Sequence, residues 1–145
     1  MGLRWQSVLA FALMVGGLVW LIQRGEWLAR SVPALVLQGC AILLMVAARL
    51  TFGRRSFHAA ADPTAGGLVT SGPYRYLRHP IYAAVLCFAW STAIDHHSWQ
   101  ALASAALITI GAAVRMYAEE TLLIGKYPEY AGYRARTARV IPFVL

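Results

Sequence analysis

The sequence predicts an all-α integral membrane protein with about four transmembrane helices, folded as a single domain over residues 1–145. The composition leads to this expectation, because 59% of the residues are hydrophobic and only 13% are charged. Soluble globular proteins carry roughly 25% charged residues, and so short a chain can bury only a modest core. The surplus of apolar side chains therefore has to face lipid.

The first two spans are apolar blocks over residues 5–22 and 31–48, each with an arginine at both ends. Each block approaches the roughly 20 residues that a helix needs to cross the hydrocarbon core of a bilayer. The first block is too long for the apolar part of a signal peptide, which has about 7–15 residues. Because no chemistry is visible in residues 1–48, we expect them to form two scaffold spans.

Two further apolar blocks, residues 81–94 and 99–114, are separated only by residues 95–98. We interpret them as a helical hairpin that crosses the membrane and returns, although the first block is short for a span. A re-entrant pair that does not reach the far side is the alternative. The run Asp95-His96-His97 between them resembles a metal ligand set, but such a run is more typical of interfacial polar residues, so we expect no metal site.

The chain carries 13 basic and 6 acidic residues, a net charge of +7. This balance would suggest nucleic acid in a soluble protein, but the basic residues fall between apolar blocks, so we expect no nucleic-acid partner. With four spans and the N-terminus inside, eleven arginines and lysines lie on the inner side and only Arg24 and Arg30 outside. The positive-inside rule therefore predicts that both termini are cytoplasmic, as are residues 49–80 and 115–145.

Two clusters of polar residues fall on that side. The run from Ser71 to Tyr82 precedes the third span, and its Pro80 suits the first turn of a helix whose N-terminus favours anions. At the end of the fourth span, Arg115 and Glu119 lie four residues apart, so they can pair or face one ligand. Ionisable residues this close to the hydrocarbon are candidates for function. The alternative is that Arg115 is an interfacial anchor with Glu119 as its exposed partner.

Taken together, the clusters resemble the isoprenylcysteine carboxyl methyltransferase family, which shares a wider grouping with the phospholipid N-methyltransferases. The resemblance covers about residues 66–143 and therefore marks these as the catalytic core. Ala84 replaces a usual glycine, and the tail is one residue shorter before Tyr130, which affects the shape of the pocket. The resemblance rests on the motifs Gly72-Pro-Tyr-Arg-Tyr-Leu-Arg-His-Pro-Ile-Tyr82, Glu119-Glu120, Tyr130-Ala-Gly-Tyr-Arg134 and Ile141-Pro-Phe143.

The resemblance implies a membrane methyltransferase that uses S-adenosylmethionine, with a cytoplasmic loop and the C-terminal tail closing the cofactor pocket. Its substrate would be a lipophilic small molecule or a lipidated molecule that enters from the membrane lipid. Arg115 and Glu119 would be the catalytic residues, with Arg115 also holding the substrate. The cofactor contacts that it implies are Gly67, Leu68, Val69, Tyr74, His79, Pro80, Ile81, Tyr82 and Glu119.

The acceptor is the remaining choice, and a carboxylate is our first expectation. A carboxylate is ionised at neutral pH and needs no general base, and Arg115 offers a planar fork to hold it. The alternative is a phospholipid amine, which has to lose a proton. Glu120 could accept that proton, although a solvated carboxylate at the helix end is the favoured interpretation. A non-catalytic membrane subunit or a small transporter is the hypothesis from another class.

Overall fold

The computed structural model describes residues 2–53 and 67–141, and over these ranges the protein is helical with no β-strand. The prediction of an all-α fold is therefore confirmed. The elements are α1 (Leu3–Gln23), α2 (Val32–Phe52), the 3₁₀ turn η2 (Gly72–Arg75), α3 (Pro80–His96), α4 (Trp99–Lys126) and α5 (Tyr130–Arg136).

Among the described helices, α1, α2 and α4 are long and apolar enough to cross a membrane. Large apolar side chains such as Leu43 and Leu50 are more than 70% exposed on α2, as lipid-facing positions are. The protein is therefore a multi-pass membrane protein. The remaining predicted span lies in α3, whose 17 residues reach about 25 Å at 1.5 Å per residue, and its crossing stays a prediction.

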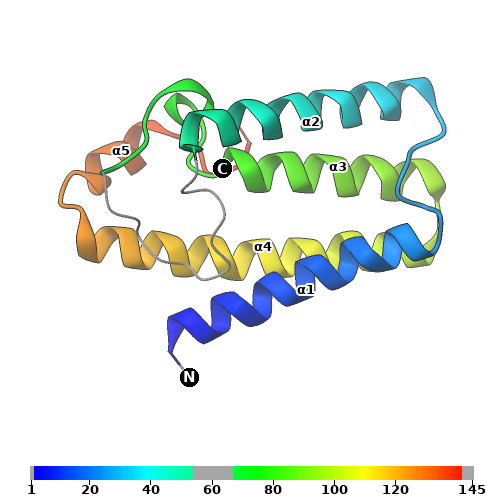
Figure 1. Cartoon of the computed structure of the whole chain (residues 1–145), viewed down its shortest axis with the longest axis horizontal. Coiled ribbons are helices and arrows are strands. Elements are labelled where there is room, and N and C mark those ends of the chain that lie inside the picture. Colours follow the sequence, from blue (N-terminus) through cyan, green and yellow to red (C-terminus); the bar gives the residue numbers. More distant parts are fainter. Residues whose placement is uncertain (1, 54–66, 142–145) are drawn as a thin grey trace.

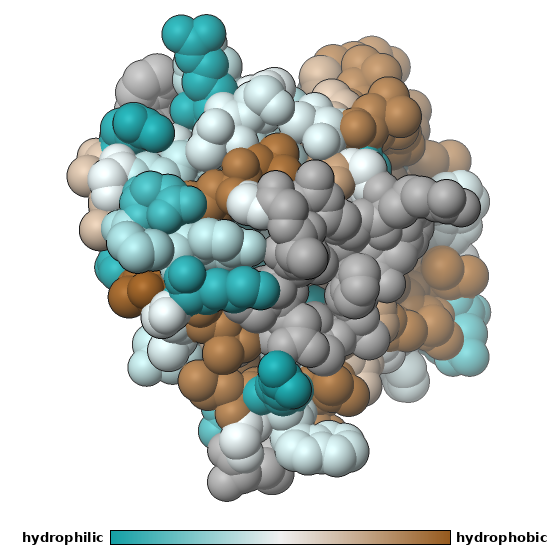
Figure 2. Space-filling view, turned by 60° about the vertical axis from the view of Figure 1, so that its left-hand side comes forward, coloured by the Kyte–Doolittle hydropathy of each residue, from teal (hydrophilic) through white to brown (hydrophobic). Residues whose placement is uncertain are grey.

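The four long helices run up and down, so α1 and α3 begin, and α2 and α4 end, at one end of the bundle, where α5 also lies (Figure 1). Seen toward this end, hydrophilic side chains gather mainly on the left of the surface, and the largest hydrophobic patches lie at the upper right and right, with smaller ones in the lower part (Figure 2). Helix α1 packs against α4, and α3 lies between α2 and α4. The two polar clusters predicted from the sequence therefore lie at this end, at the start of α3 and toward the end of α4.

The contact between α1 and α4 depends on small residues. A Cβ at Gly111 would lie 2.6 Å from the carbonyl oxygen of Ala10, and one at Gly17 would lie 2.8 Å from Ile108. The two backbones therefore approach closely, as small residues allow in membrane helix pairs.

At the opposite end, polar side chains fix the connection between α1 and α2. Asp95 accepts hydrogen bonds from the backbone N–H groups of Arg30 and Ser31, and His96 contacts the Leu28 carbonyl at 2.8 Å. In this way, Asp95 and His96 join the α3–α4 turn to the neighbouring loop. Among the described residues, no three His, Cys, Asp or Glu side chains are grouped as a metal would require.

Helix α4 is twelve residues longer than the apolar block that predicted it, because it continues from Val114 to Lys126. The apolar block ends at the first charge, but arginine and glutamate are good helix formers, so the helix continues through Arg115 and Glu119. The helix ends only before Tyr127 and Pro128, since a proline disfavours helical backbone in the residue before it. The second polar cluster is therefore carried on a rigid helix.

Candidate functional site

The site lies where α3 begins and α4 continues past its apolar stretch. Pro80 occupies the first position of α3, where its fixed φ suits a helix start, and His79 is the N-cap residue before it. Tyr82 is buried in the first turn of α3. Since α3 packs against α4, these side chains meet Arg115 and Glu119, which lie one turn apart on α4.

Arg115 is buried inside this arrangement, with 4% of its surface exposed. Its Nε donates to the Tyr82 hydroxyl at 2.6 Å, that hydroxyl donates to Glu119 Oε1 at 2.5 Å, and Arg115 Nη2 lies 3.3 Å from the same oxygen. The guanidinium also donates to the Ser7 carbonyl and lies over the Phe11 ring at 5.1 Å. The predicted pairing of Arg115 with Glu119 is confirmed, and the alternative of an outward-facing anchor is wrong because the guanidinium points into the bundle.

His79 bridges the two carboxylates of α4. Its Nδ1 lies 3.6 Å from Glu119 Oε2, and its Nε2 lies 3.1 Å from Glu120 Oε1. Burial acts to lower the pKa of His79, but the hydrogen bonds to the two glutamates outweigh it and raise the pKa above its ordinary value. The imidazolium form is therefore favoured, with Nε2 donating to Glu120 and Nδ1 facing Glu119 as an ion pair.

Glu120 contradicts the expectation of a solvated helix-end carboxylate, because only 4% of its surface is exposed. Oε1 accepts from Arg78 Nε at 3.2 Å and from Arg139 Nε at 3.1 Å, and Oε2 accepts from Arg139 Nη2 at 2.9 Å. With His79, three cationic partners from two segments of the chain surround one carboxylate. Glu120 is buried because the C-terminal tail folds back over α4, which helix spacing alone does not reveal.

The tail is held against the segment before α3 by backbone hydrogen bonds. The N–H groups of Arg78 and His79 donate to the carbonyls of Ala138 and Arg139 at 2.8 and 3.0 Å, and the Ala138 N–H donates to the Tyr76 carbonyl at 3.0 Å. The Arg78 side chain also donates to the carbonyl of Thr137. Glu120, Arg78 and Arg139 thus clamp a short paired segment, which we call the tail clamp.

Tyr133 of α5 adds a second attachment. Its hydroxyl donates to the Tyr74 carbonyl at 2.7 Å, and burial raises the pKa of Tyr133 to about 12. The ring of Tyr74 in turn lies 5.4 Å from the ring of Phe52 at the end of α2. The tail is therefore linked through Tyr74 to the end of a membrane-spanning helix.

The residues that the resemblance assigns to the cofactor fall into two groups. Burial raises the pKa of Tyr74, and the charges of Tyr133 and Glu119 add to this effect. The first group, buried or half-buried around the start of α3, comprises Tyr74, His79, Pro80, Ile81, Tyr82 and Glu119. The second, an irregular stretch before η2 with no hydrogen bond to the first among the described residues, comprises Gly67, Leu68 and Val69.

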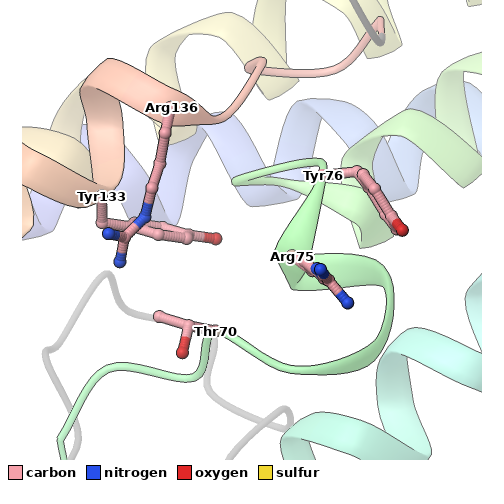
Figure 3. A pocket seen from close by; sticks show the side chains of 5 residues that line it. All are labelled: Thr70, Arg75, Tyr76, Tyr133 and Arg136. Atoms are coloured by element: carbon pink, nitrogen blue, oxygen red, sulfur yellow. The ribbon is translucent and has the colours of Figure 1, made fainter.

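Beside the tail, a pocket of about 440 Å³ separates α5 from the segment around η2. The side chains of Tyr133 and Arg136 extend from α5, and Thr70 and Arg75 lie on the facing segment (Figure 3). Tyr76 completes the lining. The sequence analysis singled out neither Arg75 nor Arg136, because two arginines 61 positions apart in the chain carry no signal of proximity.

Comparison with known proteins gives one finding: the family model for phospholipid methyltransferases matches residues 29–130, which is more than two thirds of the chain. The match begins before α2 and ends at the start of α5. It includes both polar clusters of the candidate site. No curated protein and no solved structure matches the chain.

Proposed function

Because the chain belongs to the phospholipid methyltransferase family, we propose that it methylates the amine of a lipid at the site formed by His79, Tyr82, Arg115 and Glu119. Family membership makes the protein an integral membrane methyltransferase that uses S-adenosylmethionine and a lipid-like acceptor. It also assigns the chain to an enzyme family rather than to non-catalytic subunits or transporters. The residue roles, the amine and the cytoplasmic location are our proposals.

The observation that carries the proposal is a chain of contacts: His79 lies 3.6 Å from Glu119, and hydrogen bonds join Glu119 to Tyr82 and Tyr82 to Arg115. The donor set fits S-adenosylmethionine, which supplies an electrophilic methyl group when bound. Glu119 keeps 26% of its side chain exposed, so its carboxylate can pair with the α-ammonium group. The ring of Tyr82 suits the sulfonium by cation–π contact, and the N-terminal turn of α3 suits the carboxylate.

The contacts of Arg115 favour an amine acceptor over a carboxylate. Its nitrogens donate hydrogen bonds to Tyr82, to Glu119 and to the Ser7 carbonyl. The guanidinium therefore already has partners within the protein. We therefore assign Arg115 as a positioning residue that orients Glu119 and Tyr82. An acceptor carboxylate held by Arg115 would have to displace these contacts.

A lipid ammonium has to lose its proton before it can attack. Transfer from water into an apolar site lowers the pKa of an ammonium group, so the ammonium would release its proton to water as it enters the site, and the neutral amine becomes available without a dedicated base. Glu120 is unsuited to that role because its carboxylate is committed to Arg78, His79 and Arg139. S-adenosylmethionine would supply the methyl group when bound, and the residues of the site would contribute by holding the amine in line with it.

A carboxylate acceptor is the second candidate. The run from Gly72 to Tyr82 resembles the carboxyl methyltransferases, and a carboxylate needs no proton removed. In that case Arg115 would hold the acceptor rather than orient Glu119.

We propose that the site faces the cytoplasm with both termini. Eleven of the thirteen arginines and lysines fall on that side if α3 crosses the membrane, as the positive-inside rule requires. Labelling a cysteine introduced at Gly2 in right-side-out vesicles with a membrane-impermeant reagent tests this, since labelling before permeabilisation would contradict it.

Calorimetry on the detergent-purified protein tests the cofactor site. Glu119→Gln should weaken S-adenosylmethionine binding at least tenfold, because a charge-assisted hydrogen bond contributes about 1.5 kcal/mol or more. The matched control is Glu129→Gln, which removes a carboxylate that is exposed on the tail. No binding to the folded wild-type protein, or equal binding by the two variants, would overturn the assignment.

The acceptor is tested with methyl-labelled cofactor. Label transferred to a lipid amine is stable to base, whereas label in a methyl ester is released. Base-labile label would refute the amine and establish the carboxylate. In that case, Arg115→Lys should raise the KM for the acceptor, whereas a positioning role predicts weaker cofactor binding instead.

A further inference from the structure

We propose that Arg75 and Arg136 form a phosphate-binding site in the pocket beside the tail. The ligand chemistry is a phosphate group, carried either by the headgroup of a membrane lipid or by a free phosphate compound. This site is separate from the His79–Arg115 chain, and it stands whether or not the bound molecule is the methyl acceptor.

The pocket is lined by two cations and a hydroxyl from two segments of the chain. Arg136 projects from α5 on one side, and Arg75 and Thr70 lie on the facing segment (Figure 3). A guanidinium offers several N–H donors in a planar arrangement that matches phosphate oxygens, and a threonine hydroxyl can donate one more hydrogen bond. The volume of about 440 Å³ leaves room for a phosphodiester with its neighbouring groups.

The charge of these two arginines is not neutralised by the described residues. The other arginines of this region are compensated: Arg78 and Arg139 share Glu120, and Arg115 pairs with Glu119. In contrast, neither Arg75 nor Arg136 forms an ion pair in the described part of the chain, and Arg75 contacts only the ring of Tyr76, at 5.8 Å. Two cations without an ion-pair partner that line one pocket make it electropositive, which favours an anion there.

The pocket also lies at the right level for a lipid headgroup. Arg75 belongs to η2, and its neighbour Tyr74 packs against Phe52, the last residue of α2. Because α2 is a candidate membrane span, its end marks the boundary between hydrocarbon and headgroups. Phosphate groups of the bilayer lie in that layer, where basic residues attract anionic lipids.

Binding to the detergent-purified full chain tests the proposal with three probes: inorganic phosphate, glycerol 3-phosphate and the soluble lipid dihexanoyl phosphatidylglycerol. The Arg75→Gln/Arg136→Gln variant should bind at least about 100-fold more weakly, since each charge-assisted contact contributes tenfold or more. The matched control is Arg134→Gln, which removes an exposed arginine of α5 outside the pocket lining and should change affinity less than about threefold, because exposed charges contribute little.

The three probes distinguish the sources. Binding of the lipid alone establishes a headgroup site, whereas equal binding of all three establishes a site for free phosphate. Absence of binding by every probe, or equal losses in the double variant and in Arg134→Gln, would overturn the proposal. Circular dichroism verifies that the variants are folded, so the outcome is independent of cofactor binding and of methyl transfer.

Discussion

The tail clamp makes a quantitative prediction about Glu120. Replacing it by glutamine keeps the size of the side chain and removes the charge that Arg78, His79 and Arg139 share. We expect the tail to separate more readily from the segment before α3, because the three cations would remain without their carboxylate.

The magnitude follows from the burial of the partners. The side chains of Arg78 and His79 are 10% and 5% exposed, whereas that of Arg139 is 40% exposed. At about 1.5 kcal/mol for each charge-assisted hydrogen bond, the two buried contacts sum to about 3 kcal/mol. The contact with Arg139 is solvent-screened and adds little. A local opening free energy lower by about 3 kcal/mol corresponds to roughly 100-fold faster hydrogen exchange.

The assay is amide hydrogen exchange in detergent micelles, measured at the N–H groups of Arg78, His79 and Ala138, which form the backbone bonds between the two segments. The control is Glu129→Gln, which removes an exposed carboxylate at the start of α5. Exchange in Glu120→Gln that stays within about threefold of the wild type, in a protein with unchanged helix content, would show that the carboxylate does not hold the tail.

Three further predictions concern packing, pH and the site. Gly111→Ala should destabilise the protein by about 1–3 kcal/mol, because the new Cβ would lie 2.6 Å from the Ala10 carbonyl, whereas Gly125→Ala on the same helix meets no atom within 4 Å and should not lower the thermal midpoint. Since the pKa of His79 is raised in the folded state, its protonation stabilises the fold fully below pH 6.5, and this stabilisation is lost as the pH rises through the higher folded-state pKa. His79→Gln should therefore make the thermal midpoint depend less on pH across that window. A dependence on pH equal to that of the wild type would contradict this. Tyr82→Phe should weaken S-adenosylmethionine binding about tenfold by calorimetry, because the lost hydroxyl bridges two charged groups, and full affinity would exclude the hydroxyl from the site.

The fold was largely predictable because lipid imposes a simple requirement on the sequence. A span needs an uninterrupted apolar block, and α1 and α2 match their predicted blocks at residues 5–22 and 31–48 within a few positions. The apolar block at residues 99–114 did not give the end of α4, because an apolar block shows where the hydrocarbon ends, whereas a helix ends where its backbone does. Only Pro128, just after the helix, signalled the true end.

The site was predictable where its residues are close in sequence. The pairing of Arg115 with Glu119 follows from helical spacing. The partners of Glu120 do not, since Arg78 and Arg139 lie 42 and 19 positions away and meet it only after the tail has folded back. The burial of Glu120 could therefore be found only from the three-dimensional structure.

The two adjacent glutamates contact different parts of the site because their side chains point in different directions. Successive residues of an α-helix are about 100° apart around its axis. Glu119 therefore faces Tyr82 and Arg115 between the helices, while Glu120 faces Arg78 and Arg139 under the tail. His79 contacts both carboxylates, so the position of the tail is coupled to the position of the carboxylate that we assign to the cofactor. When the tail opens, Glu120 loses its contact with Arg139, and His79 can then move toward Glu120. Because His79 is also a partner of Glu119, this movement changes the surroundings of Glu119 as well. The coupling predicts that loss of the charge at Glu120 also weakens cofactor binding, and by less than loss of the charge at Glu119.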